Sequence, residues 1–154
     1  MPAVLGSPPT DTPTTRCRYY RERCGLPAAI NPGLGSIVLR AGTDVSAVTM
    51  PTELGVRVRN HIRGRGRYTG PVISHPRAKR WTFLVNPDIP DDVSIFAEMF
   101  RINVTIARYN AQIALPAPTT DFQFRLWVHP PEGSFRLPGT QVVDAIREVT
   151  RRYR

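Results

Sequence analysis

Lysine, cysteine and long apolar runs are all scarce in this chain of 154 residues. Lys79 is the only lysine among 21 basic residues, so arginine supplies nearly all of the positive charge. No apolar run approaches the ~18 residues that a membrane-spanning helix needs, which excludes such a helix. Residues 1–15 contain no basic segment followed by an apolar stretch, so they do not form a secretory signal. The sequence therefore predicts a cytoplasmic protein without a membrane partner.

Metal-binding motifs are also lacking. Cys17 and Cys24 follow a C-x6-C spacing, whereas structural zinc sites usually take four ligands arranged in closer pairs. His61, His75 and His129 are scattered along the chain and supply no second pair of ligands. We therefore expect no metal ion and no cofactor. In a reducing compartment the two cysteines are expected to be reduced thiols, at least one of them buried.

Catalytic motifs are equally hard to find. The chain contains neither an Asp-x-Asp nor a Gly-x-Ser-x-Gly sequence. Its one adjacent acidic pair, Asp91 and Asp92, stands where the N-cap of a helix is expected. Gly64 and Gly66 do not form a dinucleotide-binding loop, because a helix is expected before them and a strand after them. The sequence therefore predicts a protein that is not an enzyme.

What the chain does contain is an uneven distribution of charge. Its formal net charge is +9, and residues 51–83 hold eight basic residues beside a single acidic one, Glu53. Residues 84–100 hold four acidic residues and no basic one. A basic excess favours association with polyanions, which are nucleic acids or acidic protein surfaces. The acidic stretch that follows the basic one is also compatible with self-association into a homo-oligomer.

The basic residues concentrate in an expected helix, the glycine-containing loop after it and the next turn between strands. Arginine can bind phosphate through two hydrogen bonds, and glycine leaves backbone N–H groups open to the same anion. Tyr68, beside Arg67, is placed to stack on a base. The other interpretation is a solvated helix face that runs into a polar loop. The candidate nucleic-acid-binding residues are Arg57, Arg59, Arg63, Arg65, Arg67, Tyr68, Arg77, Lys79 and Arg80.

The order of apolar patterns and turn residues predicts an α+β fold. Residues 1–15 are an expected disordered tail, rich in Pro and Thr, and residues 16–154 an expected single α+β domain. We expect a mostly antiparallel sheet of about six to seven short strands, with three helices. Residues 16–24 are compatible with one further short helix. The three main helices are expected to start near Pro51, Asp92 and Thr140.

Hairpins account for the expected antiparallel pairing. Residues 103–108 and 111–115 are expected to pair with each other around a turn at Tyr109 and Asn110. Residues 124–129 alternate apolar with polar side chains, which predicts a strand with one covered face. The other expected strands are residues 36–41, 45–50, 70–75 and 80–85.

Short motifs spaced over residues 47–151 resemble a known family. They are Met50-Pro51, Gly70-Pro71-Val72, Phe83-Leu84, Leu115-Pro116 and residues 125–131. This pattern, over about two thirds of the chain, resembles small actinobacterial proteins related to the N-terminal domain of bifunctional DNA primase/polymerases.

That family's nucleotidyl transfer depends on an Asp-x-Asp metal pair and a Ser-x-His motif. Here Ser74 and His75 are adjacent, and no Asp-x-Asp occurs, so the resemblance carries over no catalytic residue. It implies a non-catalytic α+β scaffold that acts near DNA or in a regulatory complex. We thus expect a basic nucleic-acid-binding protein of weak sequence specificity. The alternatives are an adaptor or regulator that binds an acidic protein through the same patch, and residual nucleotidyl transfer.

Overall fold

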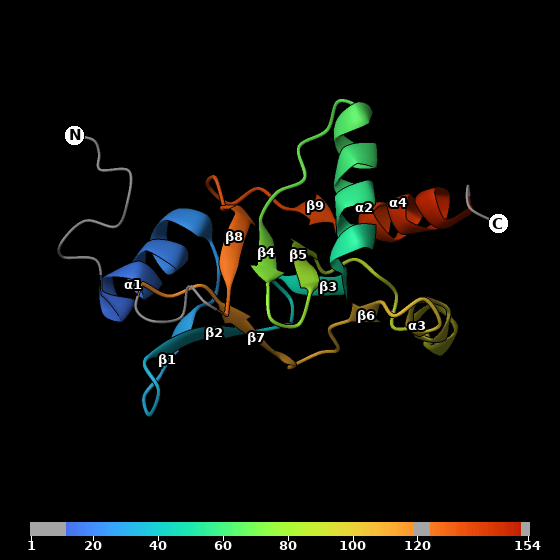
Figure 1. Cartoon of the computed structure of the whole chain (residues 1–154). Helices are drawn as coiled ribbons and strands as arrows, with labels where there is room; N and C mark the ends of the chain where they lie inside the picture. Colours follow the sequence, from blue (N-terminus) through green and yellow to red (C-terminus); the bar gives the residue numbers. More distant parts are fainter. Residues whose placement is uncertain (1–11, 119–123, 152–154) are drawn as a thin grey trace.

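The computed structural model describes residues 12–118 and 124–151. Within these ranges the chain forms an α+β fold of four helices and nine short strands, arranged in two sheets (Figure 1). The predicted fold class is confirmed, but the strands divide between two sheets instead of one. Residues 1–11, which make up most of the expected tail, lie outside the described residues. No helix in the described part is both long and apolar enough to cross a membrane.

The larger sheet has six strands in the order β6-β3-β5-β4-β8, with β9 added alongside β5. All neighbours along this order pair antiparallel, and β9 runs parallel to β5. The strands are β3 (Ser46–Pro51), β4 (Val72–His75), β5 (Arg80–Asn86), β6 (Thr105–Ile106), β8 (Leu126–His129) and β9 (Leu137–Pro138).

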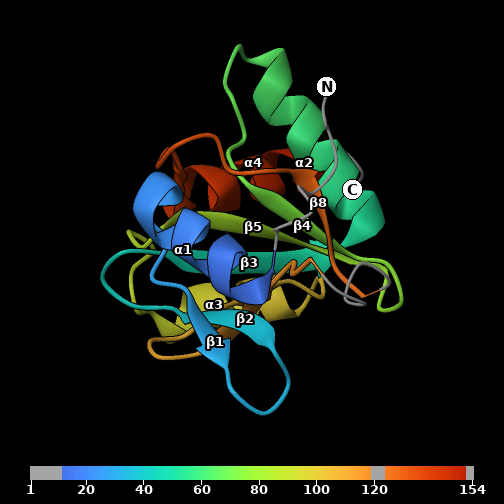
Figure 2. The same cartoon turned by 90° about the vertical axis from the view of Figure 1, so that its left-hand side faces the viewer.

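The smaller sheet has the strand order β1-β2-β7 and is antiparallel throughout. Its strands are β1 (Ala29–Asn31), β2 (Ser36–Arg40) and β7 (Gln112–Leu115). This sheet and helix α1 (Pro13–Cys24) cover one face of the larger sheet, while α2 (Thr52–Gly64) and α4 (Gly139–Arg151) lie on the other (Figures 1 and 2). Helix α3 (Val93–Phe100) lies beside β6, at the edge of the larger sheet.

The larger sheet is buried on both faces, which explains its two apolar cores. In β5 the residues 81–85 are all buried. Trp81 and Phe83 point into the core under α2 and α4, whereas Leu84 points into the core under α1 and the smaller sheet. A strand with two covered faces is expected to be apolar throughout rather than alternating. The central strand therefore anchors both layers.

Helix α2 forms where the apolar spacing predicts it. Leu54, Val58 and Ile62 recur every fourth residue and are all buried. Pro51 is the N-cap residue rather than the first helical one. Gly55 allows the helix to approach the sheet closely, because a Cβ atom there would lie 2.8 Å from Cε3 of Trp81.

Helix α1 confirms the short helix that residues 16–24 allow, and it begins three residues earlier, at Pro13. Thr12 caps it, since its hydroxyl accepts a hydrogen bond from the Thr15 backbone N–H at 3.2 Å. Cys17 and Cys24 are both buried free thiols on this one helix. Seven residues of helix separate their Cα atoms by about 10 Å, beyond the ~7 Å that a disulfide spans. The two cysteines therefore cannot pair while α1 is intact.

The expected hairpin of residues 103–108 and 111–115 is wrong. The turn itself is present, because the Ala111 N–H donates to the Arg108 carbonyl at 2.9 Å. The strands on either side diverge: β6 pairs with β3 in the larger sheet, and β7 pairs with β2 in the smaller one. This segment thus connects the two sheets.

Candidate nucleic-acid interface

Helix α2 directs its arginines to different flanks. The guanidinium of Arg57 donates to the backbone carbonyl of Val149 at 3.0 Å and so ties α2 to the C-terminal part of α4. Arg59 lies with its guanidinium carbon 5.3 Å from the centre of the Trp81 ring, a cation–π distance. Arg57 therefore serves the packing of the two helices, while Arg59 lies over the sheet.

Arg59 and Arg63, one helical turn apart, both act electrostatically on His129 at the end of β8. Burial lowers the pKa of His129, and the positive charges of Arg59 and Arg63 lower that pKa further. His129 Nε2 is buried and has no hydrogen-bond partner among the described residues. Burial and the two arginine charges therefore both favour the neutral form of the His129 imidazole.

The loop after α2 presents Arg65, Arg67 and Tyr68 on the surface. Gly66 takes a φ of 77°, which lets the chain turn back after the helix. Arg67 Nη1 donates to Oε1 of Gln141 on α4 at 2.9 Å, which leaves its other donors available. The Tyr68 ring lies 5.6 Å from that of Phe135, and the two side chains are 38% and 45% exposed. The loop thus combines arginines with a pair of exposed aromatic rings.

The turn between β4 and β5 lies beside the N-terminal end of α2, because the Thr52 N–H donates to the Lys79 carbonyl at 3.0 Å. Arg77 is exposed, and its guanidinium carbon lies 4.9 Å from the centre of the Phe124 ring. Arg80 differs, since its Nη2 donates to the carbonyls of Thr49 (3.2 Å) and Asn103 (3.1 Å). Arg80 therefore stabilises the sheet edge.

These groups form one elongated surface, because β8 runs antiparallel to β4. Ser74 pairs with Leu126 near the β4–β5 turn, and Val72 pairs with His129 near the loop after α2. Leu126 and His129 are three residue steps apart along β8, so about 10 Å separates the two ends. We name this surface the α2–β8 track, formed by Arg59, Arg63, Arg65, Arg67, Tyr68, Arg77, Phe124, His129 and Phe135.

Carboxylates neutralise arginines elsewhere but not on the track. In the described part of the chain, Arg108, Arg147 and Arg151 form ion pairs with acidic side chains. No such pair joins Arg59, Arg63 or Arg65 to a carboxylate within the same residue ranges. The charge of Glu132 raises the pKa of both Tyr68 and His129, and Arg65 and Arg67 share a hollow with Asp144 and Glu148 of α4. Asp144 and Glu148 already form ion pairs with Arg147 and Arg151, so the arginines of the track keep a net positive charge.

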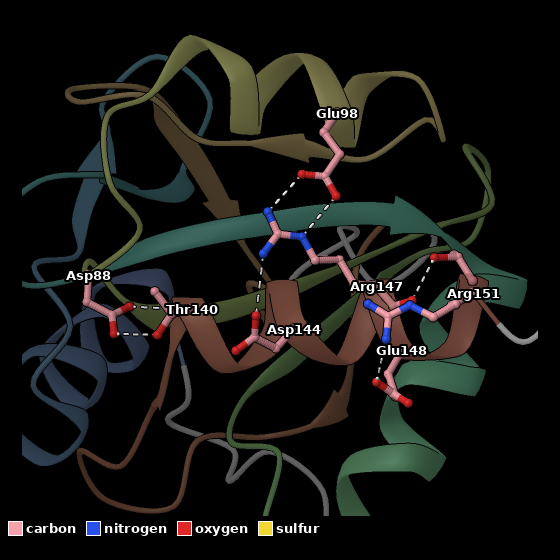
Figure 3. Close-up of polar contacts among 8 residues, drawn as sticks. Asp88, Glu98, Thr140, Asp144, Arg147, Glu148 and Arg151 are labelled. Carbon is pink, nitrogen blue, oxygen red and sulfur yellow. Dashed lines mark hydrogen bonds and ion pairs between the residues drawn. The ribbon is translucent and has the colours of Figure 1, made fainter.

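Several acidic residues have structural tasks (Figure 3). Asp88 caps α4 by accepting hydrogen bonds from the Thr140 N–H and hydroxyl at 3.0 and 2.8 Å. Glu98 on α3 accepts two hydrogen bonds from Arg147 on α4, at 2.7 and 2.9 Å. Of the two predicted candidates, Asp91 and Asp92, it is Asp92 that caps α3, by accepting a hydrogen bond from the Ser94 N–H at 2.9 Å. These carboxylates stabilise helix ends and helix contacts.

Another polar group lies between the two sheets. His75 Nε2 is 2.9 Å from the Thr82 hydroxyl, which is itself 2.8 Å from that of Thr49. Burial lowers the pKa of His75, followed by the charges of Arg125 and Arg80. These residues line one side of a hollow of about 290 Å³. Within the described ranges, no three His, Cys, Asp or Glu side chains gather closely enough to hold a metal ion.

The sequence alone did not predict three residues of the track. His129, Phe124 and Phe135 lie far from residues 57–80 in the chain, and only the pairing of β8 with β4 and the return of the chain to β9 bring them there. For Phe135, the signal available in the sequence was an aromatic residue within a loop that has prolines at both ends. The alternation of apolar and polar residues over 124–129 gave a wrong prediction of the covered face. Phe124 and Leu126 are exposed, while Trp127 packs against Tyr20.

The two half-buried histidines, His75 and His129, are expected to make stability depend on pH. Both have folded-state pKa values below the unfolded value of about 6.5, so the unfolded chain binds more protons below that pH. Their contribution is complete above pH ~6.5 and is lost as the pH falls through the folded-state values. We expect urea unfolding to give a free energy of unfolding that declines from about pH 7.5 to 5.

A double variant, His75→Gln with His129→Gln, should flatten that decline. The control is His61→Gln on α2, which should retain it. An equal pH dependence in the double variant and the wild type would show that these two rings do not cause it.

No protein-family model matches the chain, and neither the curated proteins nor the solved structures compared with it contain a match. The geometry of the track is therefore the basis for the function proposed below.

Proposed function

We propose that the protein is a non-catalytic nucleic-acid-binding protein and that the α2–β8 track is its binding surface. The observation that carries the proposal is that Arg59, Arg63 and Arg65 form no ion pair within the described residues and lie beside exposed aromatic rings. Guanidinium groups bind phosphate oxygens, and exposed rings stack on unpaired bases. A cytoplasmic location remains part of this proposal.

The expected specificity is weak. Arginines on a convex helix flank and on a loop reach the phosphate backbone, and such contacts carry no sequence information. The Tyr68–Phe135 pair supplies stacking surface that any base can use. The protein is therefore expected to bind single strands as well as duplex, with little preference among sequences.

Fluorescence anisotropy with a labelled duplex and a labelled single strand tests the proposal. For four phosphate contacts, log affinity should fall against log salt with a slope of about −3.6 on duplex and about −2.8 on a single strand. The series would run from about 50 to 300 mM NaCl, the range in which such contacts weaken steeply. No binding to either nucleic acid at the lowest salt would overturn the proposal.

Two further assays separate the other candidate functions. Binding of polyglutamate without binding of nucleic acid would favour an adaptor that docks an acidic protein on the track. Incorporation of nucleotides that requires a divalent metal would favour residual nucleotidyl transfer, in line with the resemblance to primase/polymerase N-terminal domains. Salt dependence alone does not distinguish these, because every one of these partners is anionic.

A further inference from the structure

Helix α3 carries an apolar face that is covered only in part, by Arg108 with its guanidinium carbon 5.1 Å from the centre of the Phe96 ring. Val93 and Phe100 are 74% and 71% exposed, although both are apolar. At 100° per residue, Phe96 and Ala97 lie on the same side of the helix as these two. Met99 points instead into the core. The helix therefore buries one side and offers a second apolar side to a partner.

A groove continues this face onto the edge of the larger sheet. It has a volume of about 340 Å³ and lies between the apolar side of α3 and the residues 104–108. Val104 and Ile106 contribute apolar side chains to it. Among the described strands, β6 pairs only with β3, so it forms the edge at which the groove opens. The α3 face and the groove together form a surface with both a ridge and a hollow.

The residue pattern of α3 is self-complementary. Its four exposed-side positions, 93, 96, 97 and 100, are symmetric about the middle of the helix. A second copy of α3 packed antiparallel would place Phe100 opposite Val93 and Phe96 opposite Ala97. Each contact then joins a large side chain to a smaller one, which is how packed surfaces interdigitate. A parallel arrangement would instead set Phe100 against Phe100.

The charges at the two ends of α3 favour the same arrangement. Asp91 and Asp92 precede the helix, Arg101 follows it, and all three are exposed. The only described ion pair of Asp91 is a long one, 3.9 Å to Arg108, between side chains that are 86% and 69% exposed. Antiparallel packing brings the acidic end of one helix near the basic end of the other, whereas parallel packing brings like charges together.

We propose that α3 is the interface of a two-fold symmetric homodimer, in which α3 of one copy packs antiparallel on α3 of the other. A two-fold interface uses the same patch on both copies, which the symmetric pattern of α3 satisfies. The proposal does not rest on nucleic-acid binding. Strand order places β6 and β8 at opposite edges of the larger sheet, so the dimer leaves both α2–β8 tracks uncovered.

The dimer is expected to be weak and reversible. A stable interface usually buries ~800 Å² on each partner, and a helix of eight residues with its groove offers less than that. A dissociation constant of roughly 10–100 μM is the corresponding expectation. Sedimentation velocity of the full chain, from about 1 to 500 μM, should therefore show a shift from monomer to dimer.

Phe100→Asp tests the apolar part of the interface. Because Phe100 is exposed, the substitution should keep the fold, which circular dichroism would check. It should leave the chain monomeric over the whole concentration range. The matched control is Leu34→Asp, since Leu34 is 80% exposed but lies in the β1–β2 turn. This control should dimerise like the wild type.

A charge exchange tests the antiparallel arrangement. Asp91→Arg and Arg101→Asp should each weaken self-association at least threefold, because like charges then meet at both ends, and Asp92 is left to cap α3. An equimolar mixture of the two variants should regain the lost affinity, since opposite charges meet again in the heterodimer. A wild-type chain that stays monomeric at 500 μM (about the top of the series) would overturn the proposal. So would a dimer that Phe100→Asp leaves unchanged, or a mixture no tighter than its components.

Discussion

Replacing Arg59, Arg63 and Arg65 together with serine should lower the affinity for duplex DNA by roughly 10²- to 10³-fold at about 0.1 M salt. Each phosphate contact contributes nearly one unit to the slope of log affinity against log salt, so the slope should become shallower by about three. Removing charge from this flank leaves the buried side of α2 unchanged, because Leu54, Val58 and Ile62 face the core. Fluorescence anisotropy over a salt series measures both effects.

A variant with the same loss of charge elsewhere is the control. Arg18 and Arg23 on α1 and Arg151 on α4 are exposed, and none belongs to the track. Their replacement with serine reduces the net charge equally but should change the affinity only several-fold, through the weaker long-range field. An equal loss in the two triple variants would mean that the positive charge acts as a whole and that the track is not the binding surface.

Gly55→Ala should lower the melting temperature by roughly 2–12 °C. Alanine favours helix by up to ~1 kcal/mol over glycine, but here its Cβ would lie 2.8 Å from Cε3 and 3.1 Å from Cβ of Trp81. Trp81 is only 7% exposed and belongs to the central strand, so it has little room to withdraw. Overpacking of this kind costs about 1–3 kcal/mol, and each kcal/mol corresponds to ~2–4 °C in a chain of this size. Differential scanning calorimetry would measure the shift.

Gly64→Ala is the matched control on the same helix. A Cβ atom at Gly64 would have nothing within 4 Å, so the substitution should leave the melting temperature unchanged or raise it slightly. A Gly55→Ala variant as stable as the wild type would show that α2 can move away from the sheet. The Gly55→Ala variant should also bind nucleic acid more weakly than Gly64→Ala, because Arg59 rests on the ring that the new methyl group displaces.

Local sequence signals predicted the helices well because their causes are local. The spacing of Leu54, Val58 and Ile62 fixes the buried side of α2, and the carboxylate of Asp92 starts α3 by capping it. The turn at Tyr109 and Asn110 was predicted for the same reason. Local signals do not determine which strands pair with each other. β6 and β7 flank one turn yet enter different sheets, because each completes the edge of a sheet built from distant residues.

The candidate site, too, has one part that the sequence predicted and another that it did not. Sequence placed the arginines correctly in a helix, a loop and a turn, but their tasks depend on residues far away in the chain. Arg57 donates to a carbonyl 92 residues later, and Arg80 bridges two carbonyls, so neither is presented like Arg63. His129 joins the site only through the pairing of β8 with β4. No local pattern encodes these contacts.

The contact between Arg59 and Trp81 has a thermodynamic consequence for any ligand of the track. An arginine side chain loses up to ~2 kcal/mol of rotamer entropy when it is fixed in one position. The indole ring already restrains the guanidinium of Arg59, and the packing of Gly55 on that ring restrains the indole in turn. Part of the ordering penalty is thus met during folding rather than on association. Arg59 is therefore expected to contribute more affinity per charge than Arg65, whose loop must be ordered by the ligand itself.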